Sequence, residues 1–410
     1  MKQLFSQLKS FELPLLKLAI LALFVGLFYS RALISIAMIV MLCNAIINQG
    51  PKQIKEALKR DYWLLGYIVM FGVYLLSGLY SGNINEWWKQ IMIKLPLLAL
   101  PLALAPYNRG VSLRSNKWMV SLLALFFLFT ALPMLLEFYS SYDEVLKKYA
   151  QGQTLFTPIS HVRYSLIMSF GVFLSLHGFL GLANKVSAMG LLYILLSFSL
   201  FVVIHVLAVR SGLVCLYAGL GLYAFIYFIG NPNWRYALTI LGLVFVALYF
   251  SPKIFPTIEK KMGYTLYSIE KYQKNEVEHY SDTKRWISIK VGWTLFKKAP
   301  FFGVGAGDVR DNVKEIYRGQ YPSLTLKQQL MPHNQYLRIA NAIGLIGLLI
   351  FLWLMLYPLF ILDVKLNALF FVFIFSTSVS FLVEGTIENQ IGTAYFVFIA
   401  IWLYLSRVQK

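Results

Sequence analysis

Long apolar runs recur along the whole 410-residue chain and constrain its fold more than any other feature. Hydrophobic residues make up 59% of the sequence and charged residues only 13%, whereas a soluble domain averages about 25% charged residues. A helix needs about 20 apolar residues to cross the bilayer core. Because the runs are continuous rather than alternating, they favour helices over a β-barrel. We therefore expect an all-α integral membrane protein.

Twelve runs are long enough to be candidate transmembrane helices. They cover residues 13–30, 32–49, 62–80, 91–107, 118–139, 162–183, 188–209, 212–230, 235–252, 335–361, 367–385 and 391–406. With a cytoplasmic N-terminus, fourteen Lys and Arg residues fall in the inner segments and seven in the short outer segments. This bias predicts that both termini are cytoplasmic. The chain then divides into nine spans in residues 1–252, an outer loop at 253–334 and three spans in residues 335–410.

The N-terminus and the cysteines add little about the compartment. No small-residue cleavage site follows the basic N-terminal residues before the second span, so we expect an uncleaved first helix rather than a signal peptide. Cys43 and Cys215 both lie inside apolar runs. We expect them to pack within the protein rather than to form a disulfide, and they do not indicate a redox compartment.

The outer loop at 253–334 is the only long polar interruption of the sequence. It carries fourteen Lys and Arg residues against eight Asp and Glu residues. The positive-inside rule does not explain a basic outer loop, so its charge favours an anionic substrate or contact with anionic lipid headgroups. The alternative is a loop that is basic only because it is solvated.

Two helices are predicted inside this loop, over residues 257–274 and from Ser281 or Asp282 to about Lys298. Their predicted apolar positions are Ile258, Met262, Leu266 and Ile269 in the first, and Trp286, Ile289, Trp293 and Phe296 in the second. The following G-V-G-A-G-D stretch at 303–308 lacks a preceding strand and a Walker lysine, so we interpret it as a hinge rather than a nucleotide motif. A second outer segment, 140–161, predicts a short helix from Tyr142 to Tyr149.

Two arginines are candidate anion ligands. Arg210 lies in V-R-S-G-L between two spans that almost no loop separates. Its guanidinium matches phosphate oxygens and stays charged, although a snorkelling turn residue is the alternative. Arg285 lies in the first turn of the second loop helix, where backbone N–H groups and the helix dipole also favour an anion.

His333 is the candidate for proton transfer. It follows Pro332 at the membrane surface and precedes Asn334, and histidine titrates near neutral pH. A helix-capping or packing histidine is the alternative. Asn334 and Arg338 are one turn apart on the tenth span, and charges inside spans nearly always face a cavity or a partner. We expect this face to contact a water-filled interior.

Other titratable residues lie at the ends of spans or within apolar runs. His161 and Arg163 are expected at the outer mouth of the sixth span. Glu384 and Glu388 lie one turn apart after the eleventh span, where pairing with an arginine is the simpler expectation than holding substrate. His177 and His205 lie within apolar runs and are expected to be hydrogen-bonded core residues. No metal site is expected, because the histidines are scattered and no carboxylate lies at ligand spacing.

In this order the motifs resemble the O-antigen ligase family, within the O-antigen ligase/polymerase superfamily of membrane glycosyltransferases. The resemblance rests on four stretches: R-S-G at 210–212, R-W at 285–286, A-P-F-F-G-V-G-A-G-D at 299–308 and H-N-Q-Y-L at 333–337. It is best over residues 200–350. One departure is that Asn334 follows His333, where some ligases have a second histidine.

The resemblance implies a GT-C-like fold with a large periplasmic loop, located in the bacterial inner membrane. It implies transfer of a glycan from undecaprenyl pyrophosphate to an acceptor, which in ligases is the lipid A–core oligosaccharide. Arg210 and Arg285 are implied as pyrophosphate ligands and His333 as the essential histidine. Asn334, Arg338, His161 and Arg163 are expected to help bind substrate. We expect membrane lipids as partners, no nucleic acid and no cofactor or metal.

Three alternatives remain open at this point. An O-antigen polymerase joins repeat units on the same carrier, and a protein O-oligosaccharyltransferase would yield a glycoprotein. A lipid-linked sugar flippase or transporter would instead need binding groups at mid-membrane depth, whereas the polar residues here gather at one end of the spans.

Overall fold

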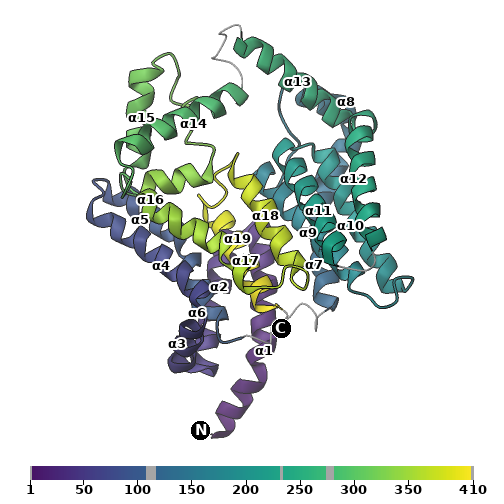
Figure 1. Cartoon of the computed structure of the whole chain (residues 1–410), viewed down its shortest axis with the longest axis vertical. Helices are drawn as coiled ribbons and strands as arrows, with labels where there is room; N and C mark the ends of the chain where they lie inside the picture. Colours follow the sequence, from purple (N-terminus) through teal and green to yellow (C-terminus); the bar gives the residue numbers. More distant parts are fainter. Residues whose placement is uncertain (1, 108–116, 231–233, 274–280, 408–410) are drawn as a thin grey trace. The chain divides into compact units, whose positions relative to one another are not determined.

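Helices form all the regular structure in the residues that the computed structural model describes, which are 2–107, 117–230, 234–273 and 281–407 (Figure 1). The helices are α1 (Lys2–Tyr29), α2 (Arg31–Asn48), α3 (Gly50–Arg60), α4 (Tyr62–Leu76), the 3-10 turn η1 (Ser77–Leu79), α5 (Ile84–Lys94), α6 (Pro96–Leu104), α7 (Lys117–Ser140), α8 (Tyr142–Ala150), α9 (His161–Leu180), α10 (Ala188–Leu207), α11 (Arg210–Gly230), α12 (Trp234–Ile254), α13 (Pro256–Gln273), α14 (Ser281–Lys298), α15 (Val309–Gln320), α16 (Gln335–Leu356), α17 (Pro358–Ile361), α18 (Ala368–Phe381) and α19 (Gln390–Leu405).

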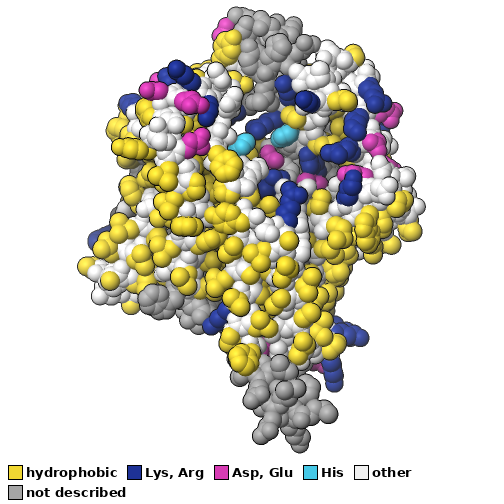
Figure 2. All heavy atoms as spheres, turned by 180° about the vertical axis from the view of Figure 1, so that it is seen from behind, with side chains coloured by type: hydrophobic (Ala, Val, Ile, Leu, Met, Phe, Trp, Pro, Cys, Tyr) yellow, Lys and Arg dark blue, Asp and Glu magenta, His cyan; other side chains and the backbone are white. Residues whose placement is uncertain are grey.

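The expected all-α integral membrane fold is confirmed. Nine helical stretches of the described chain are long and apolar enough to cross a membrane, and α18 and α19 are shorter apolar helices. The predicted span 91–107 falls on α5 and α6, which separate at Leu95 before Pro96. On the face drawn in Figure 2, hydrophobic side chains are spread over much of the surface, as expected of helices that contact lipid. The count of twelve spans and their orientation stay predictions, and the 108–116 segment, with Arg109 and Arg114, lies outside the described residues.

The chain forms two compact units, each assembled from several segments. Unit 1 comprises residues 1–112, 288–363 and 385–410, and unit 2 comprises residues 113–287 and 364–384. This division reflects packing, whereas the three predicted regions at 1–252, 253–334 and 335–410 describe chain order across the membrane.

Each unit contains a long apolar helix whose residues are mostly buried. In unit 1 this is α19, where Phe398 and Trp402 pack against Phe24 of α1 with ring centroids 5.5 and 5.8 Å away. In unit 2 it is α9, whose Phe170 meets Phe373 of α18 at 5.5 Å. Aromatic pairs of this kind add packing energy to area burial.

Both cysteines are free. Cys215 is buried in unit 2, where its backbone carbonyl accepts a hydrogen bond from the Ser376 hydroxyl at 2.9 Å. Cys43 is exposed on α2. The prediction of two packed, unpaired cysteines therefore holds for Cys215, while Cys43 is unpaired but not packed inside.

Both predicted loop helices are present, as α13 and α14. The described part of α13 ends at Gln273, and the predicted last residue, 274, lies outside the described residues. Of the predicted apolar face of α13, only Ile258 is buried, whereas Met262, Leu266 and Ile269 are 50%, 68% and 49% exposed.

The predicted apolar face of α14 was wrong. Trp286 and Trp293 are more than half exposed, and the buried positions are instead Ile287, Val291 and Leu295. Both sets have helical spacing, but aliphatic side chains bury without leaving a polar group unsatisfied, whereas Trp also carries an N–H donor.

A third loop helix, α15, was not predicted. Its buried positions Val309, Val313, Ile316 and Tyr317 follow helical spacing. The predicted short helix from Tyr142 is present as α8.

Helix α16 is broken in its middle, at Ile343 and Gly344. Both residues have non-helical dihedral angles, and Gly344 has φ of 68°. A side chain at Gly344 would come within 2.0 Å of the Phe301 carbonyl oxygen. Glycine is therefore required here for two reasons, the left-handed backbone and the close approach of another chain segment.

The segment that approaches is the glycine-rich turn at 299–308, which joins α14 to α15. Val304 N–H and Gly305 N–H donate to the carbonyls of Asn341 and Ala342, at 2.9 and 3.1 Å. In return, the Pro300 carbonyl accepts from Leu345 N–H at 2.8 Å. The turn thus supplies the hydrogen bonds that the interrupted helix cannot make for itself.

Asp308 holds the other end of this turn. Its two carboxylate oxygens accept hydrogen bonds from the backbone N–H groups of Gly82 and Asn83, at 2.7 and 2.8 Å. A side chain at Gly307 would meet the Asn83 carbonyl oxygen at 2.4 Å. The motif interpreted from sequence as a hinge does connect two loop helices, and it also fastens them to α16 and to the segment between α4 and α5.

We predict that Gly344→Ala destabilises the protein on the order of 3 kcal/mol, because the new Cβ combines left-handed strain with a backbone clash. Gly72→Ala is the matched control: it lies inside α4 with nothing within 4 Å of the added methyl, so higher helix propensity should keep it neutral or stabilising. Thermal unfolding of the detergent-purified variants measures both. Equal melting temperatures would show that the α16 break tolerates a side chain.

Candidate active site

Arg210 is the first residue of α11, and only Ala208 and Val209 separate it from α10. Ala208 ends α10 in the left-handed conformation, with φ of 45°, which turns the chain sharply. A Cβ at Gly212 would come within 2.3 Å of the Ser165 hydroxyl. The glycine of the R-S-G motif thus lets the first turn of α11 pack closely on α9, one turn from His161.

Helix α13 brings polar side chains to Arg210. The guanidinium Nη1 donates to the Thr265 hydroxyl at 2.8 Å, and that hydroxyl donates to the Lys261 carbonyl at 2.7 Å. Lys261 itself is only 8% exposed, and its ammonium donates to the Gly152 carbonyl. Arg210 and Lys261 are therefore linked through Thr265, which lies on the same side of α13 as Lys261.

Two cations of unit 2 act on His161. The half-buried His161 lies within electrostatic range of Arg285, Lys261 and Glu384. Arg163 follows two residues later and is also half-buried. Unit 2 therefore brings together two predicted ligands, His161 and Arg285, with Lys261, which the sequence reasoning missed. The signal in the sequence was the position of Lys261 in the predicted loop helix, one turn before the polar residue Thr265.

His333 belongs to unit 1, and α14 holds it. Its backbone N–H donates to the Ser288 hydroxyl at 3.1 Å, and its Nδ1 lies 3.0 Å from the Met331 carbonyl oxygen. Because a carbonyl can only accept, this contact places the proton on Nδ1 and the lone pair of the neutral ring on Nε2. A ring in this tautomer is arranged to accept a proton at Nε2.

A close contact between α14 and the segment before His333 fixes this arrangement. A Cβ at Gly292 would come within 2.7 Å of the Pro332 ring and of Leu337. Asn334 caps α16, because its side-chain oxygen accepts from Leu337 N–H at 2.9 Å. Asn334 and Pro332 therefore have structural partners, and a substrate contact for Asn334 stays a prediction.

Arg338 supports the same segment from α16. Its Nε donates to the Pro332 carbonyl at 2.7 Å, and its Nη1 lies 4.0 Å from the Glu388 carboxylate. A side chain at Gly385 would come within 2.8 Å of Nε, so this glycine makes room for the guanidinium. The expected pairing of Glu388 with an arginine is present. The role of Arg338 as a substrate ligand stays a prediction.

Glu388 also joins a buried ionic network that the sequence reasoning missed. Lys94 is fully buried, and its ammonium lies 3.1 Å from the Glu388 carboxylate and donates to the Ile387 carbonyl. Gln335 donates to Glu388 at 2.6 Å and accepts from Ile387 N–H at 2.9 Å. The signal was a lysine at the start of an apolar run, where a charge needs a partner.

The network keeps Glu388 ionised. Burial by itself would raise the pKa of its carboxyl, but the charges of Lys94 and Arg338 outweigh burial and lower that pKa to about 2. An unfolded Glu has a pKa of about 4.3. The stabilisation is therefore present above that pH and is lost as the pH falls toward 2.

Two further histidines form hydrogen bonds within the helix bundle. His205 is fully buried and bonds the Tyr217 hydroxyl and the Phe201 carbonyl, and His177 bonds the Tyr223 hydroxyl at 2.6 Å, as expected of structural residues. Among the described residues, no three His, Cys, Asp or Glu side chains gather closely enough to hold a metal ion.

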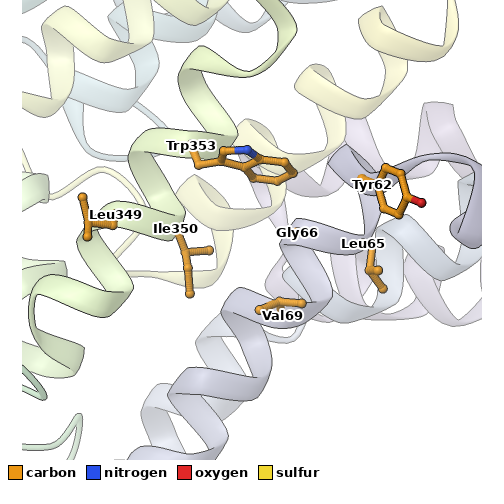
Figure 3. Close-up of a pocket in the computed structure, with 7 residues that line it drawn as sticks. All are labelled: Tyr62, Leu65, Gly66, Val69, Leu349, Ile350 and Trp353. Carbon is orange, nitrogen blue, oxygen red and sulfur yellow. The ribbon is translucent and has the colours of Figure 1, made fainter.

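An apolar groove between α4 and α16 in unit 1 has no titratable group apart from one phenol (Figure 3). It is lined by Tyr62, Leu65, Gly66, Val69, Leu349, Ile350 and Trp353. A Cβ at Gly66 would meet the Trp353 ring at 2.4 Å, so the two helices cross closely at this glycine.

Comparison with known protein families gives a match over the middle of the chain. A family model described as O-antigen ligase matches residues 165–352. The matched range contains Arg210, Arg285, His333 and Arg338. No curated protein sequence matches the chain.

We predict that Lys94→Met destabilises the protein by about 3–5 kcal/mol, because it leaves the Glu388 carboxylate buried without its lysine partner. The double variant Lys94→Met/Glu388→Gln should recover most of this loss, since the carboxylate is then neutral and an amide can still bond Gln335. Thermal unfolding in detergent measures all three proteins.

Lys89→Met is the matched control, because its ion pair with Glu86 is solvent-exposed on the lysine side and should matter little. A double variant no more stable than Lys94→Met would show that the charge of Glu388 is not what Lys94 offsets.

Proposed function

We propose that the protein is a glycosyltransferase that moves a glycan from undecaprenyl pyrophosphate to an acceptor hydroxyl, because residues 165–352 match a family model described as O-antigen ligase. The leading acceptor is the lipid A–core oligosaccharide, on the periplasmic face of the bacterial inner membrane. Members of the wider superfamily are ligases and polymerases, so joining of O-antigen repeat units is the second candidate.

The observation that carries the proposal is the cationic cluster of unit 2. Arg210, Lys261 and Arg285 carry three positive charges from α11, α13 and α14, and the last two lie within electrostatic range of His161. A pyrophosphate leaving group gains negative charge as its bond to the sugar breaks. Fixed cations stabilise that charge more in the transition state than in the ground state, which is what lowers a barrier.

In the proposed reaction, the acceptor hydroxyl oxygen attacks the anomeric carbon, and the bond from that carbon to the phosphate oxygen breaks. The hydroxyl proton passes to Nε2 of His333, whose Nδ1 proton is held on the Met331 carbonyl. The carrier leaves as undecaprenyl pyrophosphate, and the arginines stabilise the negative charge that it gains. A direct hydrogen bond from His333 to the phosphate is the other role that this residue can take.

Arg338 and Glu388 act in this proposal as positioning residues. Arg338 binds the Pro332 carbonyl, and Glu388 fixes Arg338 and Gln335. A shift of about 1 Å in the histidine would cost a large factor in rate. The buried network therefore keeps the proton acceptor in place.

We predict that deleting the gene leaves short lipopolysaccharide without O-antigen, while carrier-linked polymer accumulates. Gel profiles of lipopolysaccharide and of extracted carrier lipids measure this. A single repeat on the core would indicate a polymerase, and a lost glycoprotein would indicate protein glycosylation. Full-length lipopolysaccharide in the deletion strain would rule out the ligase. Glycan transfer by the purified protein in detergent would exclude pure transport.

We predict that Arg285→Ala and His333→Ala each lower transfer by at least about 100-fold, because each removes a group acting on the reacting atoms. Arg210→Lys should also lower transfer, since lysine cannot bind phosphate in two-point fashion. Transfer by purified variants, matched for expression, is the measurement.

Arg310→Ala is the matched control, an exposed arginine of α15 in the same loop, and should retain wild-type activity. Wild-type transfer by Arg285→Ala or His333→Ala would refute the corresponding assignment.

A further inference from the structure

The tip of the glycine-rich turn carries two exposed phenylalanines. Phe301 and Phe302 are each 65% exposed, although they lie in a segment that chain order places outside the membrane. Leu79 and Tyr80 in the same unit are 86% and 44% exposed, and the Tyr80 hydroxyl donates to the Phe302 carbonyl at 2.8 Å. Adjacent large apolar side chains left exposed indicate a surface that contacts something apolar.

Backbone hydrogen bonds fix where this tip lies. The Pro300 and Phe301 carbonyls accept from Leu345 and Ile346 N–H, at 2.8 and 3.5 Å. These two donors are eleven and twelve residues beyond Asn334, well inside the candidate span Gln335–Ile361. On its other side the tip meets Tyr80, directly after the candidate span Tyr62–Leu79. Two spans therefore bracket the tip.

The surface around the tip is apolar and continues along the spans. On α16, Leu345, Ile346 and Leu349 are 37%, 43% and 55% exposed, and Leu76 at the end of α4 is 59% exposed. The stretch A-P-F-F-G-V-G-A at 299–306 carries no charge. Lys297 and Lys298 precede it and are exposed, as expected where long cationic side chains reach back to water.

The turn also meets the requirement for irregular backbone at membrane depth. Its N–H groups from Gly303 to Gly307 all donate within unit 1: to Ala299, Asn341 and Ala342 carbonyls and to the Ser77 and Ser81 hydroxyls. A non-helical segment can lie in lipid only where its polar groups have such partners.

From these contacts we propose that Pro300, Phe301 and Phe302 form a re-entrant tip that inserts into the acyl chains of the bilayer. The occupant of this surface is bilayer lipid. The tip anchors the break in α16 at a set depth, and with it the first segment of that helix, whose cap follows His333. The inference concerns membrane contact and does not depend on the reaction catalysed.

The test uses spin labels on single cysteines in a Cys43→Ser/Cys215→Ala background. Phe302→Cys is labelled and reconstituted in phosphatidylcholine–phosphatidylglycerol vesicles without any polyprenyl lipid. Leu349→Cys on α16 is the lipid-facing control, and Leu326→Cys, 70% exposed in the polar part of the loop, is the aqueous control. Phe301→Cys gives the same readout independently if one variant folds poorly.

We expect the Phe302 label to match Leu349, with strong collisions with oxygen and weak collisions with a water-soluble nickel complex. Nickel accessibility equal to that at Leu326 would overturn the proposal. Shielding from both reagents together with spin–spin broadening would also overturn it, because a second copy of the chain would then cover the tip. So would lipid-like accessibility that arises only after undecaprenyl phosphate is added, since the carrier's own tail would then be the occupant.

Discussion

Every backbone N–H and C=O at membrane depth needs a partner inside the protein. In unit 1, the way this requirement is met at Gly344 determines how the loop helices attach to α16. The left-handed glycine interrupts α16 and frees carbonyl and N–H groups in an apolar environment. The turn at 299–308 supplies partners on both sides of the interruption. Because that turn also joins α14 to α15, one set of hydrogen bonds ties the loop helices to a membrane helix.

Unit 1 also contains a network of charged side chains, whose charges likewise need partners inside the protein. Lys94 is fully buried and the Glu388 and Arg338 side chains are mostly buried, and each ion compensates another while Gln335 and backbone carbonyls satisfy what remains. Through Arg338, which donates to the Pro332 carbonyl, the network holds the segment that carries His333. A buried ionic cluster of this kind gives rigidity where a catalytic histidine would need it, in a protein whose other interior contacts are mostly apolar.

In unit 2 the charges are arranged differently. Arg210, Lys261 and Arg285 are all positive, and their partners within the unit include neutral groups such as the Thr265 hydroxyl and the Gly152 carbonyl. Like charges held near each other are costly unless an anion joins them. Arginine and lysine side chains held on neighbouring helices are suited to bind phosphate oxygens, which is why the proposed anion site is assigned to unit 2.

The sequence alone determined the membrane class and most helix positions and proposed Arg210, Arg285 and His333 as site residues, because apolar run length, helix caps and residue chemistry are local properties. It also indicated that Glu388 would pair. It misjudged which face of α14 is buried, omitted α15, and assigned the 299–308 turn little chemistry. Only the tertiary structure decided that Lys94 meets Glu388, that Lys261 joins Arg210 through Thr265, and that the turn completes α16. Those contacts join residues far apart in the chain, and their pairing depends on how the helices pack, which no local pattern encodes.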